Sequence, residues 1–535
     1  MSIFFIRQMF VGLTDLDSNG KPIPSLATEW DVSDDGLEWT FNLRDDIYWV
    51  HRDPITGNYK KLRPVTAADV VYGVVRTLHP DTDSEYAYVL YIIEGAEELN
   101  NADPTSNDFE SILSGIKVMA LDDKTVVFRL RAPAAYFPSI TSMPITYPQP
   151  QEVIKEKEHN WTEVGFIVTN GAYTVQEWKP NEQIILEKNV EWYDADNVEI
   201  ELLSTRVVSD TAIALKLYKD GKIDFLSSSL IYQLQIIDED DIPKSELYVI
   251  PKSCTEYYGF INSKPPFDNK LLRRAFSATI NRELLIENVI KGEHIPANSF
   301  SAPGIFGSMA QNPAIGILLT LSYSERVTLA KSWLEEAGYP EGEGIEIVLG
   351  FNTSKMKKQV AEEVRRMWLD AFPNATITLK EYEWSDYIAT LKQDTPDDIK
   401  PNIYRLGWCA DYPDANNFLN DVFHSKSKQN LAKYSNPDFD KIIEQAASEK
   451  DSGERMKLYF QAEAIFINQD TAIAPIYYHT SVYLHKSWLT GVVFDQFSVD
   501  TIAKWRINWD EKRSIGTFIS LLPHPERPEG TGPIP

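Results

Sequence analysis

The sequence predicts a mixed α/β fold divided into several domains. The chain has 535 residues, of which 43% are apolar and 24% are charged, and this composition is typical of a soluble globular protein with a sizeable core. Segments with the alternating pattern of strands are interspersed with segments that have the periodicity of helices. At about 150 residues per domain, the length corresponds to roughly three and a half domains.

Three strands and three helices carry this prediction most clearly. The strands are expected at 38–44, 124–130 and 345–350, and the helices at 66–76, 270–281 and 357–369. Thr66 is expected to cap the first helix, because Asp69 follows three residues later as in a capping box. In the second helix, Leu271, Ala275 and Ala278 recur at helical spacing, which predicts that they share one buried stripe.

The net charge argues against nucleic acid and membrane surfaces as partners. The chain carries 52 basic and 79 acidic residues, a balance of −27, and such a surface repels phosphate backbones and anionic lipid. No stretch approaches the 18 apolar residues that a membrane-spanning helix needs. The apolar start, Ile3 to Ile6, is interrupted by Arg7 and is not a signal peptide. We therefore expect either a cytoplasmic protein or an exported one whose signal lies outside this sequence.

Motifs of catalysis and metal binding are absent from the sequence. There is no phosphate-binding loop, no H-E-x-x-H and no G-x-S-x-G, and the eight histidines include no pair at i, i+4. The segment from Ser354 to Lys357 matches S-x-x-K, but the companion motifs of that enzyme class are missing, so chance explains it better. We predict no cofactor and no metal site.

The two cysteines leave two interpretations open. Cys254 and Cys409 lie 155 positions apart, and a zinc site would need more ligands at closer spacing. They are either two inert buried thiols or one disulfide of an exported protein.

A concentration of aromatic and polar residues surrounds Asp411. Segment 404–420 contains Arg405 and Asp411 among apolar residues; Tyr412-Pro413 is expected to end a strand there, and Asp414 to cap the next segment. A buried carboxylate is costly unless a positive group meets it. Asp411 therefore either pairs internally with Arg405, stabilises a turn, or is held ready for the cation of a ligand.

The same segment resembles the ligand-site segment of the family 5 extracellular solute-binding proteins, the peptide-binding subunits of ABC importers. The resemblance is carried by Gly407-Trp-Cys-Ala-Asp-Tyr-Pro-Asp414 with Phe418-Leu-Asn420. Further blocks in the family's order stand at 9–13, 24–30, 39–44, 64–72, 169–173, 262–282 and 471–478. The oligopeptide-binding branch is the most similar.

The resemblance implies a two-lobed periplasmic-binding-protein-like fold of type II with an additional inserted domain. The expected parts are a discontinuous lobe I at 1–10, 165–253 and 478–535, an inserted small domain at 11–164, and lobe II at 254–477.

It also implies site residues. In that branch a disulfide joins the positions of Cys254 and Cys409, an aspartate at the position of Asp411 pairs with the peptide's α-ammonium, and Lys357 stands where a basic group can meet a ligand carboxylate. The implied ligand-binding set is Asp411, Arg405, Trp408, Cys409, Tyr86 and Lys357.

The implied function is to capture short peptides between two closing lobes and deliver them to the membrane permease of an ABC transporter, without chemistry. We expect a monomer, periplasmic or extracellular, held at the membrane by a lipoprotein anchor that this chain lacks. Only eight residues precede the block at 9–13, so we expect a mis-assigned or truncated start. The alternatives are another solute, such as an oligosaccharide, a nickel complex or an opine, or a peptidase or β-lactam-type enzyme that uses Ser354.

Overall fold

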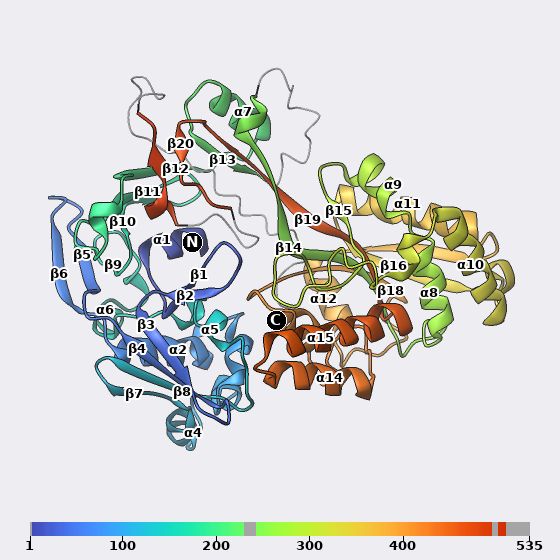
Figure 1. Cartoon of the computed structure of the whole chain (residues 1–535), viewed down its shortest axis with the longest axis horizontal. Coiled ribbons are helices and arrows are strands. Elements are labelled where there is room, and N and C mark those ends of the chain that lie inside the picture. Colours follow the sequence, from blue (N-terminus) through green and yellow to red (C-terminus); the bar gives the residue numbers. More distant parts are fainter. Residues whose placement is uncertain (1–2, 229–241, 495–500, 510–535) are drawn as a thin grey trace. The chain divides into compact units, whose positions relative to one another are not determined.

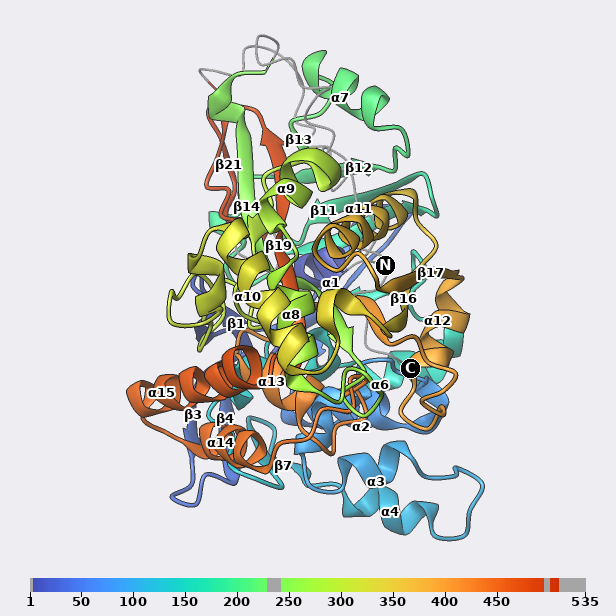
Figure 2. The ribbon, with the colours of Figure 1, turned by 90° about the vertical axis from the view of Figure 1, so that its right-hand side faces the viewer.

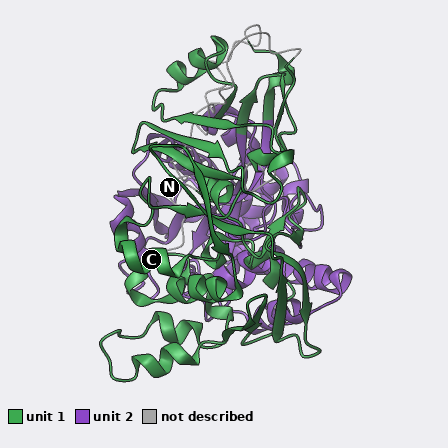
Figure 3. Ribbon diagram, turned by 90° about the vertical axis from the view of Figure 1, so that its left-hand side faces the viewer, with its two compact units in different colours: residues 1–231, 235–248, 482–525 green, residues 232–234, 249–481, 526–535 purple. Residues whose placement is uncertain are grey.

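The computed structural model describes residues 3–228, 242–494 and 501–509 (Figure 1). These residues form two units, which Figure 3 shows in different colours. The first unit comprises the described residues up to Tyr248 and again from Val482 onward, and the second comprises 249–481. The chain therefore passes from one unit to the other within β14 (Leu247–Phe260) and again within β19 (Ile473–His485).

The predicted domains correspond only in part to these two units. The expected lobe II, 254–477, lies within the second unit. The expected inserted domain and the described part of the expected lobe I lie in the first unit, except for 249–253 and 478–481, which belong to the second. The separation of 11–164 as a domain of its own stays a prediction. The parts of the expected lobe I at 1–2, 229–241, 495–500 and 510–535 lie outside the described residues.

The first unit is built from small antiparallel sheets and short helices. One sheet has the order β3 (Ala27–Val32), β4 (Glu38–Leu43), β8 (Thr125–Arg129), β7 (Val118–Asp122). Others have the orders β6 (Tyr59–Pro64), β5 (Tyr48–Arg52), β9 (Val168–Thr169) and β10 (Tyr173–Lys179), β11 (Gln183–Lys188), β12 (Leu202–Arg206). Two strand pairs are β1 (Thr14–Leu16) with β2 (Pro22–Pro24) and β20 (Leu489–Thr490) with β21 (Arg506–Ile507), and β13 (Phe225–Ser228) pairs with the end of β19. The α-helices are α1 (Ile3–Met9), α2 (Ala67–Leu78), α3 (Ala96–Asn100), α4 (Phe109–Gly115), α5 (Phe137–Ile140), α6 (Gln151–Lys157) and α7 (Thr211–Lys219).

The predicted cap of the first helix is confirmed. Thr66 precedes α2, and its backbone N–H donates to the Asp69 carboxylate at 2.9 Å, as a capping box requires. The strands expected at 38–44 and 124–130 are β4 and β8. In β4, Trp39, Phe41 and Leu43 are buried while the residues between them are not, so the alternation in the sequence marks one covered face.

The second unit is built on one mixed sheet. Its strands are β14, β15 (Ile295–Pro296), β16 (Glu346–Asn352), β17 (Thr376–Tyr382), β18 (Ile403–Cys409) and β19. β14 pairs antiparallel with β18, while β18, β16 and β17 run parallel to one another. Its α-helices are α8 (Lys270–Ala278), α9 (Arg282–Leu284), α10 (Tyr323–Glu336), α11 (Lys355–Ala371), α12 (Trp384–Leu391), α13 (Asn416–Phe423), α14 (Pro437–Ser448) and α15 (Ser452–Glu463). Helices α14 and α15 lie side by side (Figures 1 and 2).

The central strands of this sheet are buried on both faces. Every residue of β14 from Ser253 to Phe260 is buried, and side chains alternate between two cores. Tyr257 packs edge-on against Phe300 on one side, and Tyr258 packs near Trp368 on the other. Because both faces are covered, this stretch of β14 shows no alternation of buried and exposed residues.

Helices α8 and α11 cover the Trp368 side of the sheet. Trp368 of α11 donates its indole N–H to the carbonyl of Phe276 in α8 at 2.9 Å. The stripe predicted for α8 is partly wrong: Ala275 and Ala278 are buried, but Leu272 rather than Leu271 completes the buried face, because the helix presents 272, 275 and 276 to the sheet. Among the described residues, no helix combines the length and the apolar character needed to cross a bilayer.

Candidate functional site

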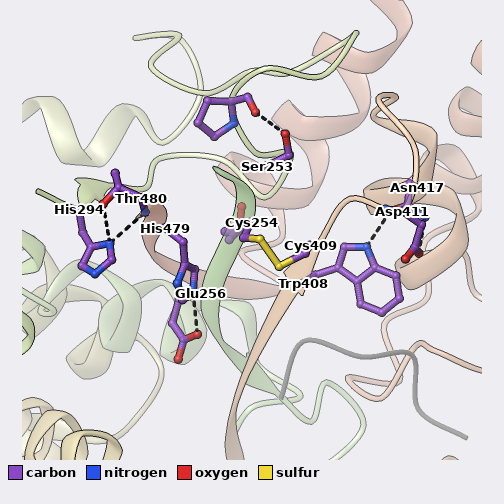
Figure 4. Close-up of a disulfide and its surroundings, with 12 residues drawn as sticks. Ser253, Cys254, Glu256, His294, Trp408, Cys409, Asp411, Asn417, His479 and Thr480 are labelled. Carbon is purple, nitrogen blue, oxygen red and sulfur yellow. Dashed lines mark hydrogen bonds and ion pairs between the residues drawn. A yellow bond between two sulfur atoms is a disulfide. The ribbon is translucent and has the colours of Figure 1, made fainter. Parts of the chain in front are cut away.

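The candidate site lies at the end of β18, where a disulfide joins this strand to β14. Cys254 and Cys409 stand directly opposite each other in the antiparallel register, with their Cα atoms 3.9 Å apart, and they form the expected disulfide. Figure 4 shows two groups of polar side chains on either side of the bond: Trp408, Asp411 and Asn417 on one side, Glu256 and His479 on the other.

The loop that carries Asp411 leaves the sheet immediately after this disulfide. The N–H of Ala410 donates to the carbonyl of Ser253 at 2.8 Å, so the loop starts from a backbone fixed to β14. Its far end is held by Asp414, which is buried and accepts hydrogen bonds from Arg455 at 2.5 Å and Tyr459 at 2.6 Å. Asp414 also accepts the N–H of Asn416 at 2.9 Å, but the N-cap residue of α13 is Ala415, so Asp414 lies one residue before the cap position it was expected to take. Both ends of the loop are therefore anchored.

Asn417 connects the groups of this loop to one another. Its amide NH₂ donates to the carboxylates of Asp411 at 3.1 Å and Asp421 at 3.2 Å. Its amide oxygen accepts the indole N–H of Trp408 and the backbone N–H of Asp411, both at 3.0 Å. The half-buried Asp411 carboxylate is thus oriented by a fully buried amide on α13.

Asp421 is a second carboxylate behind Asp411. It accepts the Tyr412 hydroxyl at 2.7 Å and also hydrogen bonds from Asn416 at 3.3 Å and Asn417 at 3.2 Å. Burial, with a contribution from the charges of Asp411 and Asp414, raises the pKa of Asp421 to about 6, although the hydrogen bonds from Tyr412 and Asn417 oppose the shift. The loop therefore concentrates negative charge and favours a cation over an anion.

Arg405 does not pair with Asp411, so that interpretation of the sequence is wrong. Its guanidinium forms a buried ion pair with Glu256 of β14, with Nη2 2.5 Å from Oε2, and Nη1 donates to Asn352 at 3.3 Å. The pairing follows from the register, because Arg405 stands opposite Tyr258 and Glu256 lies two residues along the same face of β14. Asp411 lies beyond the end of the strand.

Two histidines adjoin this ion pair. His479 of β19 lies 3.4 Å from the Glu256 carboxylate. Burial alone would raise the pKa of Glu256, but the charge of Arg405 and the contact with His479 outweigh it and lower the pKa to about 2. The backbone N–H of Thr480 donates to Nδ1 of His294 at 3.2 Å, and burial lowers the pKa of His294 to about 3. Both imidazoles are thus held in a dry, charged environment.

The other predicted site residues are placed as follows. Trp408 and Cys409 end β18 beside Asp411, and Lys357 is buried in the first turn of α11. Tyr86 belongs to the first unit, where it is half-buried and precedes the short helical segment Ala87–Ile92. Ser354 is the N-cap residue of α11, and its carbonyl accepts the N–H of Lys358. The ligand contacts assigned to these residues stay predictions.

Sequence reasoning missed Glu256, Asn417 and Asp421. A signal for the last two was present, because they stand at i and i+4 in a segment that was expected to be capped by Asp414, and that spacing puts them on one face of a helix. Glu256 gave no such signal, since its partner is 149 positions away.

Several known proteins are similar to this chain over most of its length. Residues 21–430 match the model of the "Bacterial extracellular solute-binding proteins, family 5 Middle". The periplasmic oligopeptide-binding protein OppA of Escherichia coli is 32% identical over 487 residues, which cover 91% of this chain and 84% of that protein. The probable deoxycholate-binding periplasmic protein YgiS of Escherichia coli is 30% identical over 486 residues, 91% of this chain and 85% of that protein. The structure of Haemophilus influenzae OppA in complex with RPPGFSPFR is similar with a TM-score of 0.70 and 27% identity, and covers 94% of this chain and 93% of that one.

Proposed function

The chain belongs to the family 5 bacterial extracellular solute-binding proteins, and on this premise we propose that it captures short peptides and delivers them to the permease of an ABC importer. Asp411 is the residue that receives the α-ammonium group of the peptide. The family assignment also answers the rival interpretation of Ser354 as a nucleophile, because the chain is a solute-binding protein rather than an enzyme.

The orientation of Asp411 is the observation that carries the proposal. Its carboxylate is held by Asn417 on a loop that is anchored at both ends, and it retains some exposure to solvent. A pre-oriented carboxylate binds an ammonium group without having to order itself first, and the hydrogen bonds that result are charge-assisted. Trp408, whose indole is held by the same amide, supplies an apolar wall beside it.

A terminal charge is a suitable anchor for a protein that must accept many peptide sequences. Every unmodified peptide carries an α-ammonium group, while its side chains differ. Backbone hydrogen bonds of the kind that an added strand makes, together with hydrated side-chain pockets, hold many sequences with similar affinity. Selectivity for the free amine then comes from Asp411, because an acetylated terminus offers the carboxylate no cation.

The same residue argues against an anionic solute. One relative is named a probable deoxycholate-binding protein, and deoxycholate carries a negative charge at neutral pH. The carboxylates of Asp411 and Asp421 would repel such a ligand. An uncharged oligosaccharide offers no ammonium group to Asp411.

The proposal also covers the location of the protein and its oligomeric state. The relatives named above are periplasmic, and we expect this protein outside the cytoplasm, tethered by a lipoprotein anchor and acting as a monomer that docks on its permease. Size-exclusion chromatography with light scattering tests the oligomeric state.

Native mass spectrometry of ligand exchange tests the proposal. The protein is unfolded and refolded to remove bound solutes, then mixed with equimolar peptides of three to five residues, their N-acetylated forms, an oligosaccharide, a nickel complex, an opine and deoxycholate. We expect retention of intact peptides with free amino termini. Cleavage products, or retention of a non-peptide solute in preference to every peptide, would contradict the proposal.

A further inference from the structure

Two carboxylates share the amide of one asparagine in the Asp411 loop. The NH₂ group of Asn417 has two hydrogens, and it donates to Asp411 at 3.1 Å and to Asp421 at 3.2 Å. Asn417 is fully buried, so no water can take over either hydrogen bond without a change in packing. The position of one carboxylate is therefore linked to that of the other.

The chemistry of its neighbours allows Asn417 only one orientation. Its oxygen faces two donors, the indole N–H of Trp408 and the backbone N–H of Asp411. Its nitrogen faces two acceptors, the carboxylates. A flipped amide would place its oxygen against both carboxylates and its NH₂ against both N–H groups. The amide thus fixes the direction in which Asp411 presents its oxygens.

Asp421 is surrounded by neutral donors and by other carboxylates. The donors are Tyr412 and Asn416 from the loop and the start of α13, and Asn417 from the same helix face. The charges that act on it are those of Asp411 and Asp414, and Asp414 is itself paired with Arg455. A cation bound at Asp411 would add a positive charge beside one of the carboxylates whose negative charge now acts on Asp421.

We propose that Asn417 is the positioning residue of the ammonium site, and that Asp421 couples the binding of the ammonium to the release of a proton. The inference rests on the proposed function, since it concerns the same site. In the empty protein below neutral pH, Asp421 carries a proton for part of the time. When the ammonium group binds at Asp411, Asp421 ionises, its O–H bond breaks and the proton passes to solvent, while the complex gains one favourable charge pair.

The pKa of Asp421 sets the range in which this coupling is observed. Burial raises it to about 6, so the protonated form is populated between pH 5 and 7. Affinity for free-amine peptides should rise with pH across that range. The size of this rise depends on how far the bound ammonium lowers the pKa of Asp421. For each pKa unit, the affinity at the upper end of the pH range should exceed the affinity at the lower end by a factor of ten.

Isothermal titration calorimetry tests the coupling. Trialanine and N-acetyl-trialanine are titrated into the full chain from pH 5 to 7, and at pH 6 in two buffers with different ionisation enthalpies, which counts the protons released. We expect proton release and a rise in affinity for trialanine only, and loss of both in Asp421→Asn. If Asp421→Asn keeps the pH slope and the proton release of the wild type, the coupling is refuted while the proposed function stands. If the wild type binds no peptide at any pH, the proposed function itself fails.

A matched pair of variants tests the positioning role. Asn417→Ala removes the donor to Asp411, whereas Asn430→Ala removes an equally buried asparagine of the same unit that bonds the backbone of Tyr434. We expect Asn417→Ala to reduce the preference for trialanine over its acetylated form by tenfold or more, and Asn430→Ala to leave that preference nearly unchanged. Equal effects of both variants on the preference would show that Asn417 has only a structural role.

Discussion

Glu256 and Arg405 form a buried ion pair diagonally across β14 and β18, with the guanidinium Nη2 2.5 Å from the carboxylate. Each side chain is less than a tenth exposed. The charge of Arg405 is therefore balanced within the second unit. This is consistent with the proposal that Asp411, beyond the end of the strand, is the residue that meets a ligand cation. Variants that remove one charge of this ion pair, or both, measure its contribution to stability separately from ligand binding.

Glu256→Gln should destabilise the protein by about 3–5 kcal/mol, because Arg405 would remain buried without its counter-ion. The double variant Glu256→Gln/Arg405→Met should recover most of this loss, since neither charge is then buried. Urea unfolding measures both, with the exposed Glu336→Gln as the control. A double variant no more stable than Glu256→Gln would show that the pair is not the source of the effect.

Asp411→Asn should weaken the binding of peptides with a free amino terminus by roughly 10- to 100-fold, as expected for a lost charge-assisted hydrogen bond. The affinity for N-acetylated peptides should change little, because they offer no ammonium group. Calorimetric titration measures the two dissociation constants, and Asp394→Asn on the surface of the same unit serves as the control. An equal loss for both kinds of peptide would remove Asp411 from the ammonium site.

Removal of the disulfide should lower the free energy of unfolding by about 2–5 kcal/mol. Cys254 and Cys409 are 155 positions apart, so the bond closes a long loop in the unfolded chain and reduces its entropy. Urea unfolding of Cys254→Ser/Cys409→Ser measures the effect. Reductant should lower the stability of the wild type to that of the variant and should not affect the variant; a reductant effect on the variant would point to another cause.

His294 should make the protein sensitive to mild acid. Its pKa is lowered from 6.5 to about 3, so the unfolded chain binds a proton at a pH where the folded chain does not. The contribution of His294 to the free energy of unfolding is fully present above pH 6.5. It is lost as the pH falls toward 3, by about 1.4 kcal/mol per pH unit. His294→Asn should flatten the dependence between pH 6 and 4, as measured by urea unfolding. The exposed His159→Asn should leave the slope unchanged.

Asp421 should make the stability of the protein depend on pH in the opposite direction from His294. Its pKa is raised from 3.8 to about 6, so the folded protein binds the proton more tightly, and stability is lost as the pH rises from about 4 to 6. Asp421→Asn should therefore raise the free energy of unfolding at pH 7 by about 2 kcal/mol, allowing for the partial exposure of the side chain. Urea unfolding at pH 4 should show a smaller difference. No gain at pH 7 would contradict the raised pKa.

The elements were predictable where local pattern and burial agree. The structure contains the predicted strands at 38–44 and 124–130, the predicted helix around 357–369 and the capping box of Thr66 and Asp69. Each of these depends on residues that are close together in the sequence. In α8 the predicted Ala275 and Ala278 are buried, but Leu272 is buried in place of the predicted Leu271. Periodicity alone does not determine which of two adjacent leucines faces the sheet.

The order of the residues indicated the family and, through that resemblance, the pairing of Cys254 with Cys409, which the structure confirms. The role of Asp411 as the ammonium site stays a prediction. Which charges pair with one another became visible only in the folded chain. Arg405 pairs with Glu256, 149 positions away in the sequence, rather than with Asp411, which is six positions away. The physical reason is that a buried charge pairs with what the register of neighbouring strands brings to its own face, and no local spacing in the chain records that register.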